Sequence, residues 1–313
     1  MRAMILAAGL GTRMGGLSQL RPKPALPLRG VPAIAHLLDL LVAHGVTEVI
    51  INLFHGADTM RRVAESSCPS GLRLHFSEEP RLLGTGGGIR RAAHFLRESA
   101  TSLVLAGDMW LDVDLGAFAE RHRSGGNAAT LLLRRDSRAR RFGSIGIDAE
   151  GGVRRIADSL DMGGETQSGL FVGVRAFAPA FFDALPERDD AFEDLRDVLA
   201  PRLRAGRRDV AGLLLDAAVC RWEPIGTPRE YVDANLTPPA PLPASARKLR
   251  PQAADFDAQH AVVLGRDARL GRGVHLERAV VWEDEQVPAG FRGCDGVFAG
   301  GRWHRADGDA AHG

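Results

Sequence analysis

The N-terminal half of the chain alternates continuous apolar runs with segments of helical pattern. The apolar runs are residues 3–8, 47–53, 101–108 and 128–135, and the helical patterns are residues 32–45, 87–98 and 115–125. A strand that is apolar along its whole length is buried on both faces, as in a parallel sheet covered by helices. We therefore predict an α/β fold with a mostly parallel sheet and helices on both of its faces.

The chain changes character after residue 236. Residues 237–255 are rich in proline and alanine, which predicts a linker, and aliphatic residues then recur every six positions. The two series are Leu264, Leu270, Leu276 and Trp282, and Val262, Ala268, Val274 and Val280. This period predicts a β-helix-like hexapeptide-repeat segment, with ordinary hairpins as the alternative. The predicted units are a domain over 1–236, a linker over 237–255, the repeat segment over 256–302 and a frayed tail over 303–313.

Composition excludes several classes of protein. Lys and Arg number 40 against 39 Asp and Glu, so the bulk charge favours neither nucleic acid nor a membrane surface as a partner. Cys68, Cys220 and Cys294 lie far apart and form no CxxC pair, so we expect no zinc site or disulfide framework. No apolar run approaches the ~18 residues of a membrane span, and no signal peptide is evident. We therefore expect a cytoplasmic protein.

Residues 5–14, ILAAGLGTRM, lead from the first apolar run into a glycine-rich turn. No GK[ST] follows, which excludes a Walker A loop, and Met14 occupies the third glycine position of a dinucleotide fingerprint. Backbone N–H groups of such a turn can line a triphosphate, and Arg13 adds donors suited to phosphate. Ligands of parallel sheets lie beyond the carboxyl ends of the strands, so residues 9–13 and 107–108 are the candidates, and a plain turn is the alternative.

Two charged residues extend this interpretation. Lys23 lies in RPKPALP, whose prolines predict an extended, stiff backbone, and a rigidly held ammonium offsets charge in nucleotidyl transfer. Asp108 ends an apolar run, where a carboxylate beside phosphate oxygens is a natural Mg²⁺ ligand. The alternatives are a solvated proline turn for Lys23 and a helix N-cap for Asp108.

A second glycine-rich segment, LLGTGGGI, spans residues 82–89. Four glycines in five positions let another group approach the backbone closely. A planar nucleobase that packs on this backbone and hydrogen-bonds to it would fit, and a flexible hinge is the alternative.

Together, LAAGLGTRM…RPKPALPLRGVP, LGTGGGI, LAGDM and IGTPREYVDAN resemble the sugar-1-phosphate nucleotidyltransferases, or NDP-sugar pyrophosphorylases. The segment AVVLGRDARLGRGVHLERAVVW is similar to the β-helix appendage of the mannose-1-phosphate guanylyltransferase branch. The resemblance implies a Rossmann-like catalytic domain, a short left-handed parallel β-helix, and Mg²⁺ as cofactor. The implied reaction joins an NTP and a sugar 1-phosphate to give an NDP-sugar, such as GDP-mannose, and pyrophosphate. Strand edges at an open β-helix end also predict a homo-oligomer formed through the C-terminal segment.

The resemblance implies site residues on both sides of the reaction. The catalytic residues would be Arg13, Lys23 and Asp108, with Asp108 as the metal ligand; the nucleotide-binding residues would be Ala8, Gly9, Gly11, Thr12, Arg13, Gly84, Thr85, Gly86 and Gly87; and the sugar-phosphate side would include Gly143, Asp158, Gln167 and Gly169.

The second half of the chain departs from the family pattern. Ser159 stands where the family has a lysine that meets the sugar phosphate, and Pro224 stands where it has a magnesium-binding aspartate. The substitutes we considered are Arg175 or Arg141 for the lysine and Glu223 or Asp216 for the aspartate. An alternative function is therefore a catalytically weakened, NDP-sugar-binding regulatory or sensor paralogue. A weaker alternative is a β-helix assembly module carrying a relic domain.

Overall fold

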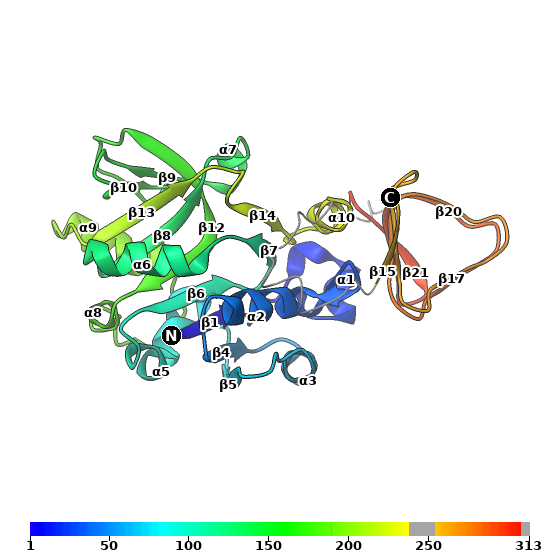
Figure 1. Ribbon diagram of the computed structural model, residues 1–313, viewed down its shortest axis with the longest axis horizontal. Helices are drawn as coiled ribbons and strands as arrows, with labels where there is room; N and C mark the ends of the chain where they lie inside the picture. The colour runs from blue at the N-terminus through cyan, green and yellow to red at the C-terminus, as the bar shows by residue number, and fades with distance from the viewer. Residues whose placement is uncertain (189, 238–253, 308–313) are drawn as a thin grey trace.

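The computed structural model describes residues 1–188, 190–237 and 254–307, and all structural statements below concern these residues. Figure 1 shows an α/β body and a C-terminal β segment at one end of it, with helices α1 (Gly16–Leu20) and α10 (Pro228–Leu236) between the two. Most of the predicted linker, residues 238–253, lies outside the described residues.

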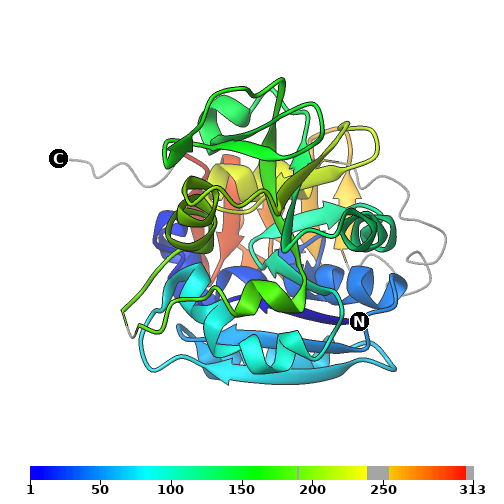
Figure 2. The ribbon, with the colours of Figure 1, turned by 90° about the vertical axis from the view of Figure 1, so that its left-hand side faces the viewer.

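One sheet forms the centre of the body (Figure 2). Its strands, in spatial order, are β11 (Leu160–Asp161), β10 (Val153–Ile156), β9 (Ser144–Ile147), β12 (Gln167–Phe177), β6 (Ser102–Ala106), β1 (Arg2–Leu6), β4 (Glu48–Leu53) and β5 (Arg73–Glu78), with β8 (Ala129–Arg134) paired to β12 and β13 (Val210–Leu215) paired to β8. Strands β6, β1, β4 and β5 pair in parallel, which confirms the predicted mostly parallel α/β sheet. Strand β12 then extends the sheet with antiparallel pairings to β6, β8 and β9.

Helices cover both faces of this sheet, as predicted. The helices on one face are α2 (Ala33–Ala43), α3 (Ala57–Ser66) and α6 (Leu115–Gly125), and those on the other are α4 (Gly84–Arg91), α5 (Ala93–Arg97), α8 (Pro179–Phe182) and α9 (Ala200–Arg204). Strand β1 shows why its residues from Ala3 onward are apolar. Ala3 and Ile5 belong to the first core, while Met4 between them belongs to the second.

The C-terminal segment consists of parallel strands that repeat along the chain. Its strands are β16 (Val262–Gly265), β18 (His275–Val281) and β20 (Arg292–Ala299), the pair β17 (Arg269–Leu270) and β19 (Gln286–Val287), and the antiparallel edges β15 (Ala254–Asp257) and β21 (Arg302–Arg305). Leu264 pairs with Val281 and not with Trp282. The spacing between neighbouring parallel strands is therefore one residue shorter than three six-residue units. Trp282, which we aligned with Leu264, instead packs against the body.

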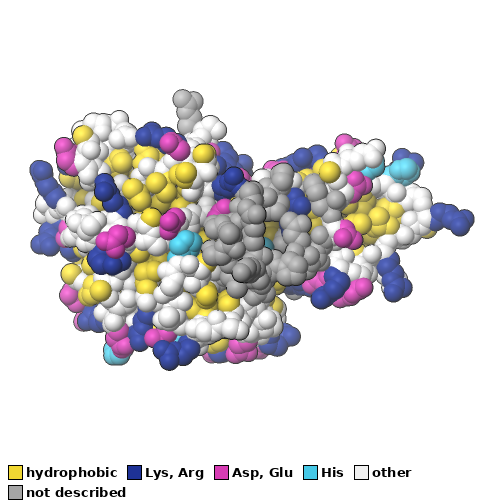
Figure 3. Space-filling view, viewed as in Figure 1, with side chains coloured by type: hydrophobic (Ala, Val, Ile, Leu, Met, Phe, Trp, Pro, Cys, Tyr) yellow, Lys and Arg dark blue, Asp and Glu magenta, His cyan; other side chains and the backbone are white. Residues whose placement is uncertain are grey.

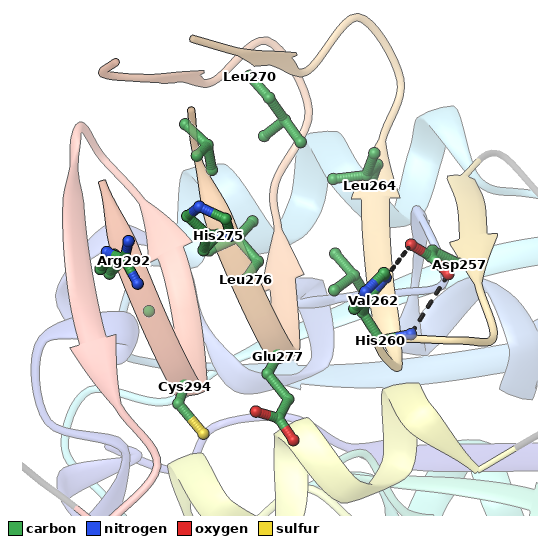
Figure 4. A pocket seen from close by; sticks show the side chains of 12 residues that line it. Asp257, His260, Val262, Leu264, Leu270, His275, Leu276, Glu277, Arg292 and Cys294 are labelled. Atoms are coloured by element: carbon green, nitrogen blue, oxygen red, sulfur yellow. Dashed lines mark hydrogen bonds and ion pairs between the residues drawn. The ribbon is translucent and has the colours of Figure 1, made fainter. Parts of the chain in front are cut away.

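An open hollow of about 650 Å³ lies in this segment. Figure 4 shows Val262, Leu264 and Leu270 at the hollow, with Asp257 and His260 joined at its rim. The His260 Nδ1 and Asp257 Oδ2 atoms are 2.9 Å apart. The parallel pairing is the arrangement that a β-helix requires, but the β-helix itself stays a prediction.

We predicted a frayed tail from residue 303, but the ordered strand β21 extends beyond this residue. Strand β21 continues the ordered segment to Arg305, because it pairs with β20 and buries His304. Residues 308–313 of that tail lie outside the described residues.

The C-terminal segment packs on the body through a common apolar core. Met14 and Leu17 from the N-terminal loop meet Val263, Val280 and Trp282 from the segment. The ion pairs of this junction are Arg21–Glu283 (2.6 Å), Arg229–Asp295 (2.7 Å) and Arg278–Asp233 (2.7 Å). The segment is therefore part of the support of the N-terminal loop.

The surface carries mixed charge on the side drawn in Figure 3, where basic and acidic side chains are interspersed. Among the described residues, the helices are too short or too polar for any of them to cross a membrane.

His122 gives the fold a dependence on pH. Its ring is buried between α6 and the sheet, with Nδ1 2.8 Å from Thr130 Oγ1. Burial and Arg123 lower the pKa of His122 from 6.5 to about 4. The unfolded chain therefore takes up a proton on His122 at a higher pH than the folded chain. Protonation then favours the unfolded chain, so the free energy of unfolding falls as the pH falls from 6.5 toward 4.

We expect the free energy of unfolding to fall by about 2 kcal/mol more in the wild type than in His122→Gln between about pH 7.5 and about pH 5. Glutamine keeps a polar group for Thr130 but does not titrate. Urea unfolding of both chains at the two pH values measures the difference. Equal losses in the two chains would show that His122 is not the titrating group.

Candidate active site

A cavity of about 470 Å³ lies at the carboxyl edge of the parallel strands. The loop after β1, the end of β4 and the segment after β6 all reach it, because parallel strands end at the same edge of a sheet. The predicted site residues that line it are Ala8, Gly9, Gly11, Arg13, Lys23, Gly84, Thr85 and Asp108. Segments that we predicted separately from the sequence thus meet in one place.

The glycine turn makes room for Lys23. Gly11 has a φ of 68° and precedes the short helix η1 (Thr12–Met14). A Cβ atom at Gly11 would lie 3.2 Å from Lys23 Cγ, so the lysine side chain crosses directly over the glycine. The backbone angle favours glycine there, and the tight contact with Lys23 adds to that preference. Thr12 does not line the cavity.

Lys23 is buried at the wall of the cavity. We predicted an extended backbone for its segment, and this prediction is wrong. The segment forms a 3₁₀ turn, η2 (Lys23–Ala25), because the φ of proline also suits the first turn of a helix. The Lys23 Nζ donates a hydrogen bond to Gly226 O (3.1 Å) and lies 3.7 Å from Asp108 Oδ2. Burial lowers the pKa of Lys23 below its ordinary value; Asp108 and Glu230 oppose this shift, and Arg13 adds to it.

Asp108 lies between β6 and β7 (Met109–Asp112), so it is not the helix N-cap of the alternative interpretation. Its backbone carbonyl accepts a hydrogen bond from Ile225 N (3.0 Å), which joins the end of β6 to the segment after β14 (Arg221–Pro224). Its carboxylate is partly exposed to the cavity. The residue can therefore hold a metal ion next to Lys23.

A buried polar network that the sequence reasoning missed holds the loop after β1. Asn52 Oδ1 accepts from Ala7 N (2.7 Å), and Asn52 Nδ2 donates to Glu79 Oε1 (2.7 Å). Glu79 Oε2 accepts from Leu83 N (3.0 Å), at the start of α4. The available signal was the position of Asn52 at the carboxyl end of an apolar strand, the same rule that found Asp108.

The second glycine segment is the first turn of helix α4 and not a loop. Gly86 N and Gly87 N donate to Phe192 O (2.9 and 3.3 Å), and Thr85 N donates to Glu193 Oε2 (3.3 Å). These acceptors satisfy the open end of the helix, which offsets the low helix propensity of glycine. Gly86 and Gly87 therefore do not line the cavity. Phe192, which sequence reasoning missed, makes the close approach that we expected from a nucleobase.

The two arginines considered as substitutes for the missing lysine already have carboxylate partners. Arg175 donates to both oxygens of buried Asp194, at 2.5 and 3.0 Å. Arg141 donates to Glu230 Oε1 at 2.7 Å. Arg175 lines the cavity, but its charge is balanced by Asp194.

The four residues predicted for the sugar-phosphate side do not line the cavity. Gln167 and Gly169 lie in the first part of β12, where Gln167 accepts from Arg135 Nη2 (2.7 Å). Gly143 follows α7 (Ala139–Phe142), and Asp158 lies in the turn between β10 and β11. The cavity walls on this side are the apolar side chains Phe142, Phe171 and Trp222.

The position of the missing aspartate does face the cavity. Pro224 lines it, whereas Glu223 binds Arg138 Nη1 (2.8 Å) and does not. Asp216 is exposed and pairs with Arg135 (3.0 Å). Glu223 does not take the place of that aspartate, because neighbouring side chains of a strand point to opposite faces. Asp216 does not line the cavity either.

Comparisons with known proteins found sequences similar to this chain. A family model described as Nucleotidyl transferase matches residues 2–239. The mannose-1-phosphate guanylyltransferase of Mycobacterium tuberculosis is 30% identical over 299 residues, which cover 92% of this chain and 81% of that protein. The UTP–glucose-1-phosphate uridylyltransferase of Synechocystis is 27% identical, over 65% of this chain and 55% of that protein.

Solved structures are similar as well. The crystal structure of HddC from Yersinia pseudotuberculosis has a TM-score of 0.61 and 25% identity, and covers 75% of this chain and 97% of that chain. A second structure of HddC, complexed with GMP-PN, matches with the same values.

Gly86→Ala tests the packing of α4 against Phe192. An added Cβ would lie 2.4 Å from the Phe192 ring, so we expect a loss of about 1–3 kcal/mol in the free energy of unfolding. Replacing Phe192 by leucine in the same chain should recover part of the loss. The control is Gly9→Ala, where a Cβ meets nothing within 4 Å. Urea unfolding that shows equal effects for the two alanine variants would contradict this packing.

Proposed function

Because the chain belongs to the nucleotidyl transferase family, we propose that it joins an NTP and a sugar 1-phosphate, giving an NDP-sugar and pyrophosphate. The observation that carries this proposal is the meeting of Arg13, Lys23 and Asp108 in one cavity at the carboxyl edge of the sheet. The two cations suit a substrate that carries several phosphates, and the carboxylate suits the metal ion that would accompany it.

The proposed reaction is attack by a sugar phosphate oxygen on the α-phosphorus of the NTP, with pyrophosphate as the leaving group. The side chains Arg13 and Lys23 neutralise charge on the triphosphate, and the N–H groups of Ala8, Gly9 and Gly11 bind phosphate oxygens. Positioning and charge neutralisation are the whole of the catalysis in such a transfer, with no covalent enzyme intermediate. Lys23 is suited to this role because it is buried and held by Gly226 O.

The residues of the cavity also fit Mg²⁺. The carboxylate of Asp108 faces the space where phosphate oxygens would lie, and magnesium prefers one or two carboxylates together with substrate phosphates. When bound, the ion would neutralise charge that develops on the phosphate oxygens. The chain's contribution is the fixed position of Asp108, which the bond from Ile225 N to its backbone carbonyl secures.

For the substrates, we favour guanylyl transfer to a mannose-like sugar phosphate. The support is the relative of Mycobacterium tuberculosis, which matches both the body and the C-terminal segment. The similarity to a uridylyltransferase keeps uracil open as the base. Gly84 and Thr85, at the cavity, are the residues of the glycine segment that we assign to base binding.

A second candidate function is supported by the sugar side of the cavity. Arg175 and Arg141 are each bound to a carboxylate, and apolar side chains form the walls. A protein with an intact nucleotide half and few free cations for the second substrate could act as an NDP-sugar sensor. We place this regulatory function second, because Arg13, Lys23 and Asp108 are all retained.

We also propose that the C-terminal segment is a short left-handed β-helix, that it joins copies of the chain into a homo-oligomer, and that the protein acts in the cytoplasm. The parallel pairing of β16, β18 and β20 supports the first point, and Leu270, exposed at the open hollow, supports the second. We expect Leu270→Glu to lower the sedimentation coefficient of the full chain. A coefficient that is the same in both chains, or that of a monomer in the wild type, would contradict this assembly.

The direct test of the proposed reaction measures pyrophosphate release with Mg²⁺, a panel of NTPs and a panel of sugar 1-phosphates. We expect release with at least one pair, and GTP with mannose 1-phosphate is the favoured one. Tight NDP-sugar binding without release from any pair would instead support the sensor.

Lys23→Ala should lower kcat about 10²–10³-fold, because it removes charge neutralisation made in the transition state. The matched control is Arg97→Ala, a surface arginine that pairs with Asp183. Circular dichroism of both variants checks the fold. A near-normal rate in Lys23→Ala would mean that the lysine has another role.

A further inference from the structure

Glu230 is a buried carboxylate that our assignment of the site from sequence did not include. It lies in the first turn of α10, is 7% exposed, and lines the same cavity as Arg13, Lys23 and Asp108. Its Oε1 accepts from Arg141 Nη2 at 2.7 Å. Its Oε2 is buried and has no hydrogen-bond partner among the described residues.

Helix capping does not account for this carboxylate. Thr227 caps α10 by accepting a hydrogen bond from Glu230 N (3.2 Å). In a complete capping box, the glutamate side chain would accept from the N–H of Thr227 in return, and this would satisfy both ends. The free Oε2 does not make that bond. Leaving a buried acceptor unsatisfied costs about 1–3 kcal/mol, so a group that enters the cavity and satisfies it gains that amount.

The surroundings of Glu230 Oε2 place it at the charged end of the cavity. A Cβ atom at Gly226 would lie 2.8 Å from this oxygen and 3.3 Å from Arg13 Nη2, so both groups flank Gly226. The carbonyl of Gly226 accepts from Lys23 Nζ, which also lies near Asp108. The carboxylates Asp108 and Glu230 therefore line this end of the cavity together with the cations Arg13 and Lys23.

This arrangement selects a cation over a neutral donor. Arg141 pairs with Glu230 Oε1, so the repulsion falls on the unpartnered Oε2 and on Asp108. A triphosphate bound by Arg13 and Lys23 would bring about four negative charges toward these oxygens. A divalent cation between the carboxylates and the phosphates turns that repulsion into attraction. A sugar hydroxyl could also donate to Glu230 Oε2, but it would leave the repulsion uncompensated.

We propose that Asp108 and Glu230 are the two carboxylates of one divalent-cation site. This inference rests on the proposed function, which supplies the substrate phosphates that complete the site. The second metal ligand thus comes from the first turn of α10. The β14 residue Pro224, which faces the cavity, has no side-chain group that could bind a metal. In this arrangement the carboxylate of Asp108 binds the metal, and the ammonium of Lys23 donates to phosphate.

The test is binding of Mn²⁺ alone, measured by electron paramagnetic resonance of the free ion. We expect Glu230→Gln and Asp108→Asn each to weaken Mn²⁺ binding at least about ten-fold, or 1.4 kcal/mol. Glutamine keeps an acceptor for Arg141, and thermal unfolding checks that the variant folds. The control is Glu223→Gln, a neighbouring carboxylate bound to Arg138 outside the cavity, which should bind Mn²⁺ like the wild type.

Two results would overturn the proposal: wild-type affinity in Glu230→Gln, or no Mn²⁺ binding by the wild type at millimolar concentrations. Loss of activity in Glu230→Gln with unchanged Mn²⁺ binding would also overturn it and would assign the carboxylate to the sugar. The proposed reaction is judged separately, by pyrophosphate release from the wild type. A metal site that needs Glu230 in a chain that releases no pyrophosphate would leave this inference standing and refute the reaction.

Discussion

The hydroxyl of Tyr231 joins the parts of the chain on which the cavity depends. It is fully buried, donates to Pro27 O (2.5 Å) and accepts from Trp282 Nε1 (3.0 Å). Burial raises the pKa of Tyr231, so the hydroxyl keeps its proton and continues to donate. One side chain thereby fixes helix α10 against the segment that carries Lys23 and against the C-terminal strands.

The same junction explains why the C-terminal segment matters to the site. Met14 and Leu17, which follow Arg13, are buried against Val263 and Val280 of that segment. Removing the strands would expose this core, at a cost of about 25 cal/mol for each Å² of apolar surface. The segment therefore helps to shape the glycine turn as well as offering an edge to other copies of the chain.

Much of the site follows from position along the sheet. Apolar runs end at Ala8 and Asp108, and parallel strands deliver such ends to one edge, so the place of the cavity and part of its lining could be predicted without a structure. The residues predicted for the sugar phosphate could not be placed in this way. Gln167 and Gly169 were predicted from the resemblance alone, and they lie in the first part of β12, outside the lining of the cavity. Phe192 gave no local signal, and Glu230 stood in the quoted motif IGTPREYVDAN without a sign that it faces the cavity. Each contacts a residue more than 85 positions away in the chain, Gly86 and Arg141 respectively.

The sequence by itself determined the mostly parallel sheet, its helical cover and the residues at the carboxyl ends of its strands. These depend on periodicity and on residues close together in the chain, where hydrophobic pattern and turn chemistry act. Only the tertiary structure decided that Phe192 closes the end of α4, that Arg175 is bound by Asp194, and that a carboxylate of α10 faces the cavity. Those outcomes depend on which distant side chains share a buried space, since a buried charge or polar group must find its partner there.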